Sequence, residues 1–354
     1  MRKYVIESSF SLKQALKVMD SLLANTIFVE DNHGLCASIS SGDVRRSLLC
    51  DIDLDTPVSE IMHSNPLALE KGFAMEDVRQ IFLEKKISAI PLIDENRRVI
   101  DVLLRSDILE EHQRVHEKIS ASVVIMAGGK GTRLDPFTRI LPKALIPVGN
   151  KSIIEVVMDE FRMFGIEDFY ISICDKAEMI KAYFNGTTVP YSINFIEEKI
   201  ALGTVGAVGL LPKQIDHPFF ISNCDIIVKT DFSDLYHFHN SGGFSLTLVA
   251  SLKHHIISYG VCELEKDGSL KTIKEKPEYD LLINTGMYVV DPEARQYIPV
   301  DTAFDITDLI VALKENNHRI GVYPVSEKAW IDIGQWGAYR DGVQRLKMLL
   351  TDDL

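Results

Sequence analysis

Hydrophobic and polar positions follow one order twice in the first part of the chain. Apolar residues at helical spacing come first, at Leu12, Ala15, Leu16, Met19, Leu22 and Leu23. Apolar runs at 27–29 and 35–39 then predict strands around a polar turn, and Asp43 lies near the start of a further helix. The order returns as a helix, two strands and a helix start, at 77–83, 89–93, 99–104 and Asp107. Asp43 and Asp107 lie 64 residues apart, so the pattern predicts an internal duplication.

After residue 121 the pattern changes to apolar strands that alternate with helices. Strands are predicted at 122–127, 169–173, 191–196 and 218–222, and helices at 153–161 and 179–184. This alternation indicates an α/β domain with a largely parallel sheet. Ligands of such sheets bind beyond the carboxyl ends of the strands. Residues that directly follow strands are therefore the first candidates for a site.

Composition and charge narrow the classes of function. Apolar residues make up 46% and charged residues 25% of the 354 residues, as in soluble globular proteins of more than one domain. The formal net charge of −13 argues against nucleic acid or an anionic membrane as a partner. The five cysteines form no C-x-x-C pair, and no apolar run approaches the length of a membrane span. We therefore expect a cytoplasmic protein.

A glycine-rich loop follows the first predicted strand of the second part. It is formed by Gly128, Gly129, Gly131, Thr132 and Arg133, with Lys143 ten residues beyond. Glycines let backbone N–H groups approach an anion, and the two cations suit a polyphosphate. The order of the glycines matches neither the dinucleotide fingerprint nor the P-loop. The loop is therefore a candidate phosphate site of another kind, with a plain turn as the alternative.

The glycine-rich loop continues into a longer motif. Residues 128–138 are G-G-K-G-T-R-L-D-P-F-T, and residues 142–148 are P-K-A-L-I-P-V. This combination resembles the signature of the sugar-1-phosphate nucleotidyltransferases. The resemblance implies a Rossmann-like α/β domain at 122–354 with a mostly parallel mixed sheet. It also implies an enzyme that joins a sugar 1-phosphate to a nucleoside triphosphate (NTP) and releases pyrophosphate.

Two aspartates occupy apolar surroundings in the sequence. Asp225 follows the predicted strand 218–222, and Asp332 lies in the apolar stretch 330–334. Buried acids are rare unless paired or metal-bound, and Mg²⁺ prefers one or two carboxylates together with phosphate oxygens. In the resembled family the matching residues share a magnesium ion. The resemblance implies catalytic roles for Arg133, Lys143 and Asp225.

Further segments match the family's substrate pockets. Residues 197–206, E-E-K-I-A-L-G-T-V-G, resemble the nucleobase-binding segment, with Val205 where alanine is usual. The resemblance implies nucleotide binding by Gly128, Gly129, Gly131, Thr132, Arg133, Lys143, Glu198 and Gly203. Residues 259–260, 275–277 and 284–286 resemble the sugar-binding segments. They imply sugar-phosphate binding by Gly260, Glu275, Lys276, Asn284 and Gly286.

The duplicated first part resembles a tandem pair of CBS domains. Residues 88–94, S-A-I-P-L-I-D, match that family's middle strand, and residues 40–43 match its S/T-x-x-D ribose-contacting signature. The second copy departs from this signature, because Leu104 stands three residues before Asp107. The resemblance implies an α+β module at 1–115, with copies at about 1–57 and 58–115, a linker at 116–121, and ligand residues Ser40, Asp43 and Asp107. Either an adenine-nucleotide sensor or a ligand-free dimerisation module fits, and we expect a homodimer.

The pairing of the two modules guides the choice of substrates. A CBS pair before this transferase resembles the glucosamine-1-phosphate guanylyltransferases of legionaminic acid pathways, which favours GTP and glucosamine 1-phosphate. Mannose-1-phosphate guanylyltransferase and a UTP- or dTTP-dependent glucose-1-phosphate transferase are the enzymatic alternatives. A regulatory subunit that binds a nucleotide-sugar without turnover is the alternative from another class.

Overall fold

The computed structural model describes residues 2–22, 24–49, 52–70, 72–85, 87–108 and 116–334, and the chain divides into two compact units, Met1–Val115 and His116–Leu354. Leu23 of the first predicted helix, residues 109–115 and the end of the predicted transferase domain at 335–354 lie outside the described residues. The predicted linker, 116–121, packs on the second unit. The Ile119 N–H donates to the Phe164 carbonyl at 3.0 Å, and the His116 and Phe164 rings lie 4.3 Å apart.

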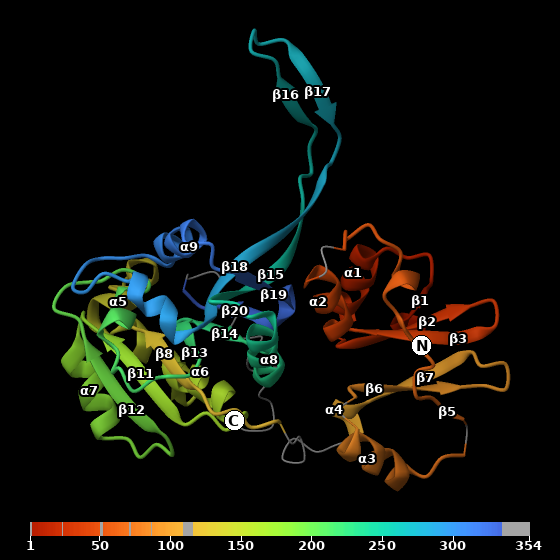
Figure 1. Ribbon diagram of the computed structural model, residues 1–354, viewed down its shortest axis with the longest axis horizontal. Coiled ribbons are helices and arrows are strands. Elements are labelled where there is room, and N and C mark those ends of the chain that lie inside the picture. The colour runs from red at the N-terminus through yellow and green to blue at the C-terminus, as the bar shows by residue number, and fades with distance from the viewer. Residues whose placement is uncertain are drawn as a thin grey trace. The chain divides into compact units, whose positions relative to one another are not determined.

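The first unit contains one arrangement twice (Figure 1). The first copy comprises η1 (Arg2–Tyr4), β1 (Val5–Glu7), α1 (Leu12–Leu22), β2 (Thr26–Asp31), β3 (Gly34–Ser40), α2 (Ser41–Leu49) and η2 (Val58–Glu60). The second comprises β4 (His63–Ser64), β5 (Leu69–Glu70), α3 (Met75–Glu84), β6 (Ala89–Ile93), β7 (Val99–Leu104) and α4 (Arg105–Ile108). β1 and β5 begin 64 residues apart, as do α2 and α4, which agrees with the predicted duplication.

The two copies share a core, and a strand of the second copy joins the sheet of the first. The sheets have the orders β1-β2-β3-β4 and β5-β6-β7, so β4 pairs with the strand β3 of the preceding copy. Phe28 and Leu35 pack in one apolar cluster with Ala89 and Val99. The Val99 N–H also donates to the Glu30 carboxylate at 2.6 Å. These contacts make the tandem pair one structural unit.

The second unit is built on a seven-stranded sheet of order β12-β11-β8-β13-β18-β15-β19. From the first to the fifth sheet strand in sequence, the elements are β8 (Ser122–Met126), η4 (Thr132–Leu134), α5 (Phe137–Ile140), η5 (Lys143–Leu145), β9 (Pro147–Val148), β10 (Lys151–Ser152), α6 (Ile153–Arg162), β11 (Asp168–Ile173), α7 (Ala177–Asn185), β12 (Ser192–Glu197), η6 (Gly206–Leu210), β13 (Phe219–Asn223), β14 (Ile226–Val228), α8 (Phe232–Gly242) and β15 (Leu246–Ile256). The remainder are β16 (Val261–Leu264), β17 (Leu270–Lys274), β18 (Glu278–Val290), η7 (Pro292–Tyr297), α9 (Ile306–Glu315), β19 (Ile320–Ser326), η8 (Glu327–Ala329) and β20 (Trp330–Asp332).

The central sheet is mostly parallel, and helices cover both of its faces. β18 pairs antiparallel with β13 and β15, whereas the other neighbouring strands of this sheet pair parallel. Val123 and Ile125 of β8 lie in the apolar cluster with α6, α7 and α8, and Val124 lies in the cluster with α9. A strand buried on both faces has a continuous apolar sequence, which explains the run at 122–127. The predicted fold class is confirmed.

Candidate active site at the carboxyl ends of the central strands

The glycine-rich loop leaves the sheet where three parallel strands end together. β8 ends at Met126, which lies opposite Ser172 of β11 and Asn223 of β13. The Ala127 N–H donates to the Ser172 hydroxyl at 3.1 Å, and the Cys224 N–H donates to the Met126 carbonyl at 3.3 Å. The loop is thereby fixed at the sheet edge where ligands of parallel sheets bind.

The loop combines one crowded glycine with open backbone. Gly131 has a φ of +66°, and a Cβ there would lie 3.0 Å from the Cβ of Lys143 and 3.0 Å from the Cγ2 of Thr138. A Cβ on Gly129 would meet no described atom within 4 Å. Thr132 and Arg133 are exposed, and Arg133 has no ion-pair partner among the described residues. Open N–H groups beside an unpaired guanidinium suit an anion.

Lys143 forms an ion pair with Asp225 at this edge. The two side chains are only 12% and 7% exposed. Asp225 lies between β13 and β14, and its carbonyl accepts from the Ile333 N–H at 2.9 Å. A nearly buried carboxylate requires a partner, and here an ammonium group supplies it. The site therefore already holds a cation on Asp225.

The second carboxylate approaches the first across Gly334. β14 pairs antiparallel with β20, with Ile226 opposite Asp332. A Cβ on Gly334 would lie 2.1 Å from Oδ2 of Asp225 and 2.9 Å from Oδ1 of Asp332. The Gly334 N–H donates to Asp332 at 2.7 Å. Only glycine fits between these two carboxylates, so the backbone at this point brings them to one place.

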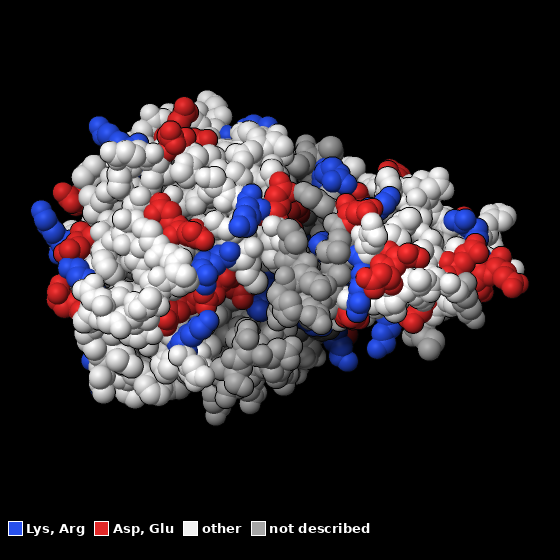
Figure 2. Space-filling view, turned by 90° about the horizontal axis from the view of Figure 1, so that it is seen from below, with Lys and Arg blue, Asp and Glu red and all other residues white. Residues whose placement is uncertain are grey.

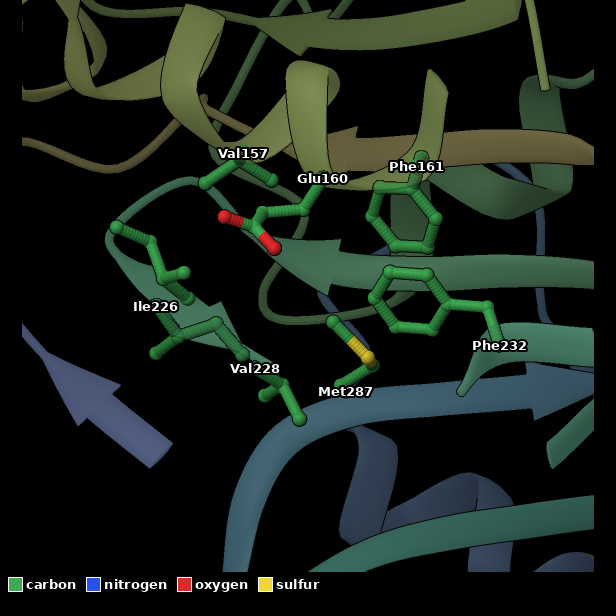
Figure 3. Close-up of a pocket in the computed structure, with 8 residues that line it drawn as sticks. Val157, Glu160, Phe161, Ile226, Val228, Phe232 and Met287 are labelled. Atoms are coloured by element: carbon green, nitrogen blue, oxygen red, sulfur yellow. The ribbon is translucent and has the colours of Figure 1, made fainter. Parts of the chain in front are cut away.

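The segment that carries Asp225 rests on packed core. Val157, Phe161, Ile226, Val228 and Met287 help to line a small pocket between β14 and α6 (Figure 3), which has no room for a water molecule. Burial raises the pKa of the Cys224 thiol to about 12. This thiol stays protonated and is not a nucleophile.

Glu198 packs against the glycine-rich loop. A Cβ on Gly128 would lie 2.5 Å from its Oε1, and the Leu202 N–H donates to its Oε2 at 2.8 Å. Gly203, at φ +80°, has another environment, because a Cβ there would lie 2.7 Å from the Phe304 carbonyl oxygen. The structure thus places Glu198 beside the loop, whereas crowding by the segment before α9 accounts for glycine at position 203.

Asn284 and Gly286 lie on β18, which pairs with β13, the strand that precedes Asp225. β18 bulges here, and the Thr285 hydroxyl donates to the Val249 carbonyl at 2.8 Å. Gly286 has a φ of +89°, and a Cβ there would lie 2.5 Å from Nδ2 of Asn223. The bulge therefore packs against the loop between β13 and β14. The sequence analysis did not assign Asn223 or Gly334 to the site, because their roles depend on contacts between distant segments.

Gly260, Glu275 and Lys276 lie on a projecting arm, defined as residues 257–277. Beyond the sheet, β15 and β18 continue as a two-stranded ribbon that ends in the β16–β17 hairpin (Figure 1). Glu275 and Lys276 are exposed, and a Cβ on Gly260 would lie 2.9 Å from Oε2 of Glu275. These three predicted residues are grouped on the arm and apart from the glycine-rich loop (Figure 1).

In the first unit, Ser40 and Asp43 bind each other. The Ser40 N–H and hydroxyl each lie 2.7 Å from Oδ2 of Asp43, and Arg46 pairs with the same carboxylate. Hydrogen bonds between residues three positions apart, as here, are typical of the start of a helix, and this helix is α2. Asp107 lies on α4, and Leu104 precedes that helix. The predicted ligand residues of the first copy thus have a structural role as well.

The surface and the helices add two observations. On the face shown in Figure 2, acidic and basic side chains are interspersed over the described residues. No helix in the described ranges combines the length and the apolar character that a membrane span needs.

Comparison with known proteins finds a family match in each of the two units. The family model described as nucleotidyl transferase matches residues 122–348, and the CBS domain model matches residues 58–114. The chain is similar to a UTP--glucose-1-phosphate uridylyltransferase of Synechocystis, 30% identical over 247 residues, which are 63% of either chain. It is also similar to a mannose-1-phosphate guanyltransferase of Candida albicans, 30% identical over 225 residues, which are 60% of either chain.

A solved structure shares the fold. HddC from Yersinia pseudotuberculosis has a TM-score of 0.51 and 22% identity, and the match covers 64% of this chain and 100% of that one. The chain spans less than two thirds of the length of the curated relatives it matches. The family match covers more than half of the chain and includes the glycine-rich loop and both carboxylates. The chain belongs to the nucleotidyl transferase family and carries a CBS domain before its transferase unit.

Proposed function

We propose that the chain is a sugar-1-phosphate nucleotidyltransferase that forms a nucleoside-diphosphate sugar and pyrophosphate. The observation that carries the proposal is the joining of Lys143, Asp225 and Asp332 around Gly334, beside the glycine-rich loop. Both curated relatives named above are transferases of this reaction class. Positively charged groups and paired carboxylates at one edge suit a triphosphate with its metal ion.

The reaction needs positioning and charge neutralisation more than a covalent nucleophile. A phosphate oxygen of the sugar 1-phosphate attacks the α-phosphorus in line, and the bond to the β-phosphate oxygen breaks. The open loop backbone binds the triphosphate, Arg133 stabilises the α-phosphate and the leaving pyrophosphate, and Lys143 neutralises the phosphates. The predicted roles of Lys276 with the incoming sugar phosphate and of Glu275 with the sugar hydroxyls require the projecting arm to approach the triphosphate at the glycine-rich loop, from which the structure holds the arm apart. The proposed substrates are metabolites of the cytoplasm, where we place the reaction.

The carboxylates fit a magnesium ion. Asp225 and Asp332 supply oxygen donors that Mg²⁺ prefers, and Asp225 already binds the cationic group of Lys143. Bound Mg²⁺ would polarise the triphosphate and neutralise part of its charge. Among the described residues no cluster of three His, Cys, Asp or Glu could hold a metal ion. Phosphate oxygens and water would complete the coordination.

The nucleobase and the sugar are proposed from the domain pairing. We favour GTP with glucosamine 1-phosphate, a precursor of bacterial surface glycans. Relatives of 30% identity bear the names of a uridylyltransferase acting on glucose 1-phosphate and a guanyltransferase acting on mannose 1-phosphate. These names support both of the enzymatic alternatives, the guanylyltransferase and the uridylyltransferase.

Pyrophosphate release tests the proposal. We would measure it with Mg²⁺ for GTP, UTP, dTTP, CTP and ATP against a panel of sugar 1-phosphates. Release with one pair is expected and would identify both substrates. Nucleotide binding without release across the panel would contradict the proposal and favour a regulatory subunit.

Arg133→Ala provides the matched mutational test. Arg133 has no ion-pair partner among the described residues, so its replacement by alanine leaves no carboxylate there without its cation. We expect kcat to fall about 100-fold or more, as for removal of a transition-state donor. Lys151→Ala is the control, because Lys151 is 58% exposed and pairs with Asp159 of α6, outside the loop. Near-normal turnover by folded Arg133→Ala would exclude this role.

A further inference from the structure

Lys176, which joins β11 to α7, has a backbone conformation that lysine rarely adopts. Its φ of +51° and ψ of 33° lie in the left-handed region, at the N-cap of α7. N-cap residues are usually Ser, Thr, Asp or Asn, whose side-chain oxygens accept from helix N–H groups, and an ammonium group cannot accept. A lysine in this place therefore needs stabilising contacts elsewhere.

The ammonium group of Lys176 makes these contacts. Its Nζ donates to the Thr138 carbonyl at 2.9 Å and to Oδ2 of Asp175 at 2.7 Å. The side chain is 24% exposed. Thr138 lies on α5, 38 residues earlier in the chain. Lys176 thus ties the β11–α7 connection to α5.

α5 in turn holds the glycine-rich loop. The Thr138 hydroxyl lies 3.0 Å from the Gly131 carbonyl, and the Cγ2 of Thr138 crowds the Cβ position of Gly131. The same hydroxyl lies 2.9 Å from Asp135, whose pKa is lowered by hydrogen bonds from Arg139 and Thr138. Thr138 is only 3% exposed, so these bonds are shielded from water. The conformation of Gly131 therefore depends on where α5 is held.

We propose that Lys176 is a positioning residue for the nucleotide: its ammonium group fixes Thr138, and Thr138 fixes the backbone that binds the triphosphate. The inference rests on the proposed function of the loop. The loop binds the triphosphate before and during the reaction, so loss of the tether weakens nucleotide binding more than it slows turnover. The sugar phosphate is bound by other residues, and its KM is unaffected.

Two substitutions separate this role from a structural one. Lys176→Met removes the ammonium donors and keeps the stem. Lys176→Asn replaces the ammonium group with an uncharged amide too short to reach the Thr138 carbonyl, while favouring the left-handed conformation. We expect both to raise the Kd of the nucleotide about tenfold. The probe is GTP or UTP with Mg²⁺ and without sugar phosphate, measured calorimetrically. We expect the thermal unfolding midpoint of Lys176→Asn to equal or exceed that of the wild type. If the role of Lys176 were only structural, the variant would lose nucleotide affinity only when its unfolding midpoint also fell.

Lys181→Met is the matched control. Lys181 lies on α7, is 22% exposed, and bonds to Glu178 at 3.0 Å and Glu197 at 2.8 Å. Among the described residues it has no ion pair with α5. Its nucleotide Kd is expected to equal that of the wild type. A nucleotide Kd within about twofold of wild type in both folded Lys176 variants would overturn the proposal. Wild-type pyrophosphate release alongside that result would leave the proposed function standing, and absence of nucleotide binding by the wild type would overturn both.

Discussion

At the residue scale, the ion pair of Lys143 and Asp225 is a contact that the proposed reaction has to change. Both side chains are nearly buried, and removing one partner of such a pair typically costs about 3–5 kcal/mol. A bound triphosphate can pair with the Lys143 ammonium group in place of Asp225, while Mg²⁺ binds the Asp225 carboxylate. Nucleotide and metal should therefore bind best together.

Lys143→Met tests this coupling without nucleotide. The substitution frees the Asp225 carboxylate, so we expect Mn²⁺ to bind about tenfold more tightly than to the wild type, as measured by electron paramagnetic resonance. Lys151→Met is the control, because that lysine pairs with Asp159 at 2.7 Å on the surface. Equal Mn²⁺ affinity in wild type and Lys143→Met would show that the pair does not compete with metal.

His239 gives stability a pH dependence. It is 1% exposed, its Nδ1 lies 2.9 Å from the Thr247 hydroxyl, and burial lowers its pKa from 6.5 to about 4. Between these values the unfolded chain binds a proton that the folded chain does not, so the free energy of unfolding falls as pH falls. The loss approaches about 3 kcal/mol at pH 4.

The measurement is urea unfolding at pH 7.5, 6.5 and 5.5. His239→Gln can keep a hydrogen bond to Thr247 and does not titrate, so its stability should fall less over this range. An identical pH dependence in both proteins would place the titrating group elsewhere.

At the element scale, local pattern predicted the strands β8, β11, β12 and β13 and the helices α6 and α7, but not β15, β18, β19 or the arm. The helix predicted at 153–161 is α6, and the strand predicted at 191–196 is β12 shifted by one residue. β8 is buried on both faces, so its continuous apolar run correctly predicted a buried strand. Leu264 and Leu270 of the arm are 65% and 59% exposed, so their apolar character does not indicate burial.

The candidate site also combines residues that the sequence pattern could predict with residues that only the folded chain brings together. Glycines and charges of the loop could be predicted because they are consecutive in the sequence. The closeness of Gly334 to Asp225, and of Gly286 to Asn223, depends on which strands pair. No local pattern contains that information.

Shortening the arm should affect one substrate. Replacing residues 261–274 with Asn-Gly removes exposed strands and leaves Gly260 and Glu275 in the chain, so the thermal unfolding midpoint should change little. We expect the KM of the sugar 1-phosphate to rise about tenfold, with the NTP KM unchanged. The double variant Glu275→Gln with Lys276→Met, which keeps the full-length arm, is the comparison. We expect it to raise the KM of the sugar 1-phosphate and to leave the NTP KM unchanged, as the shortened arm does. Equal rises in both KM values would assign the arm another role.

At the scale of the whole molecule, the CBS unit raises the question of assembly. A family model matches its second copy, and the structure places a similar arrangement before it. Whether Ser40 and Asp43 contact a ribose stays a prediction, since they bind each other in the structure. The resemblance to legionaminic acid enzymes also stays a prediction.

We expect light scattering to give twice the chain mass of 39.8 kDa. A monomer would contradict the proposed dimer. Addition of AMP or ATP distinguishes the two CBS alternatives. A rise in the unfolding midpoint that Asp43→Ala removes would indicate a sensor, and an unchanged midpoint would indicate a ligand-free dimerisation module.

The strand β4, which joins the sheet of the preceding copy, affects how the chain folds as it is synthesised. His63 and Ser64 follow the first copy in sequence but complete its sheet at Ala37 and Ser38. A ribosome that has finished the first copy has therefore not yet supplied that sheet's last strand. The nascent chain exposes the unpaired edge of β3 until the second copy begins to emerge, and the first copy expressed alone would leave that edge open.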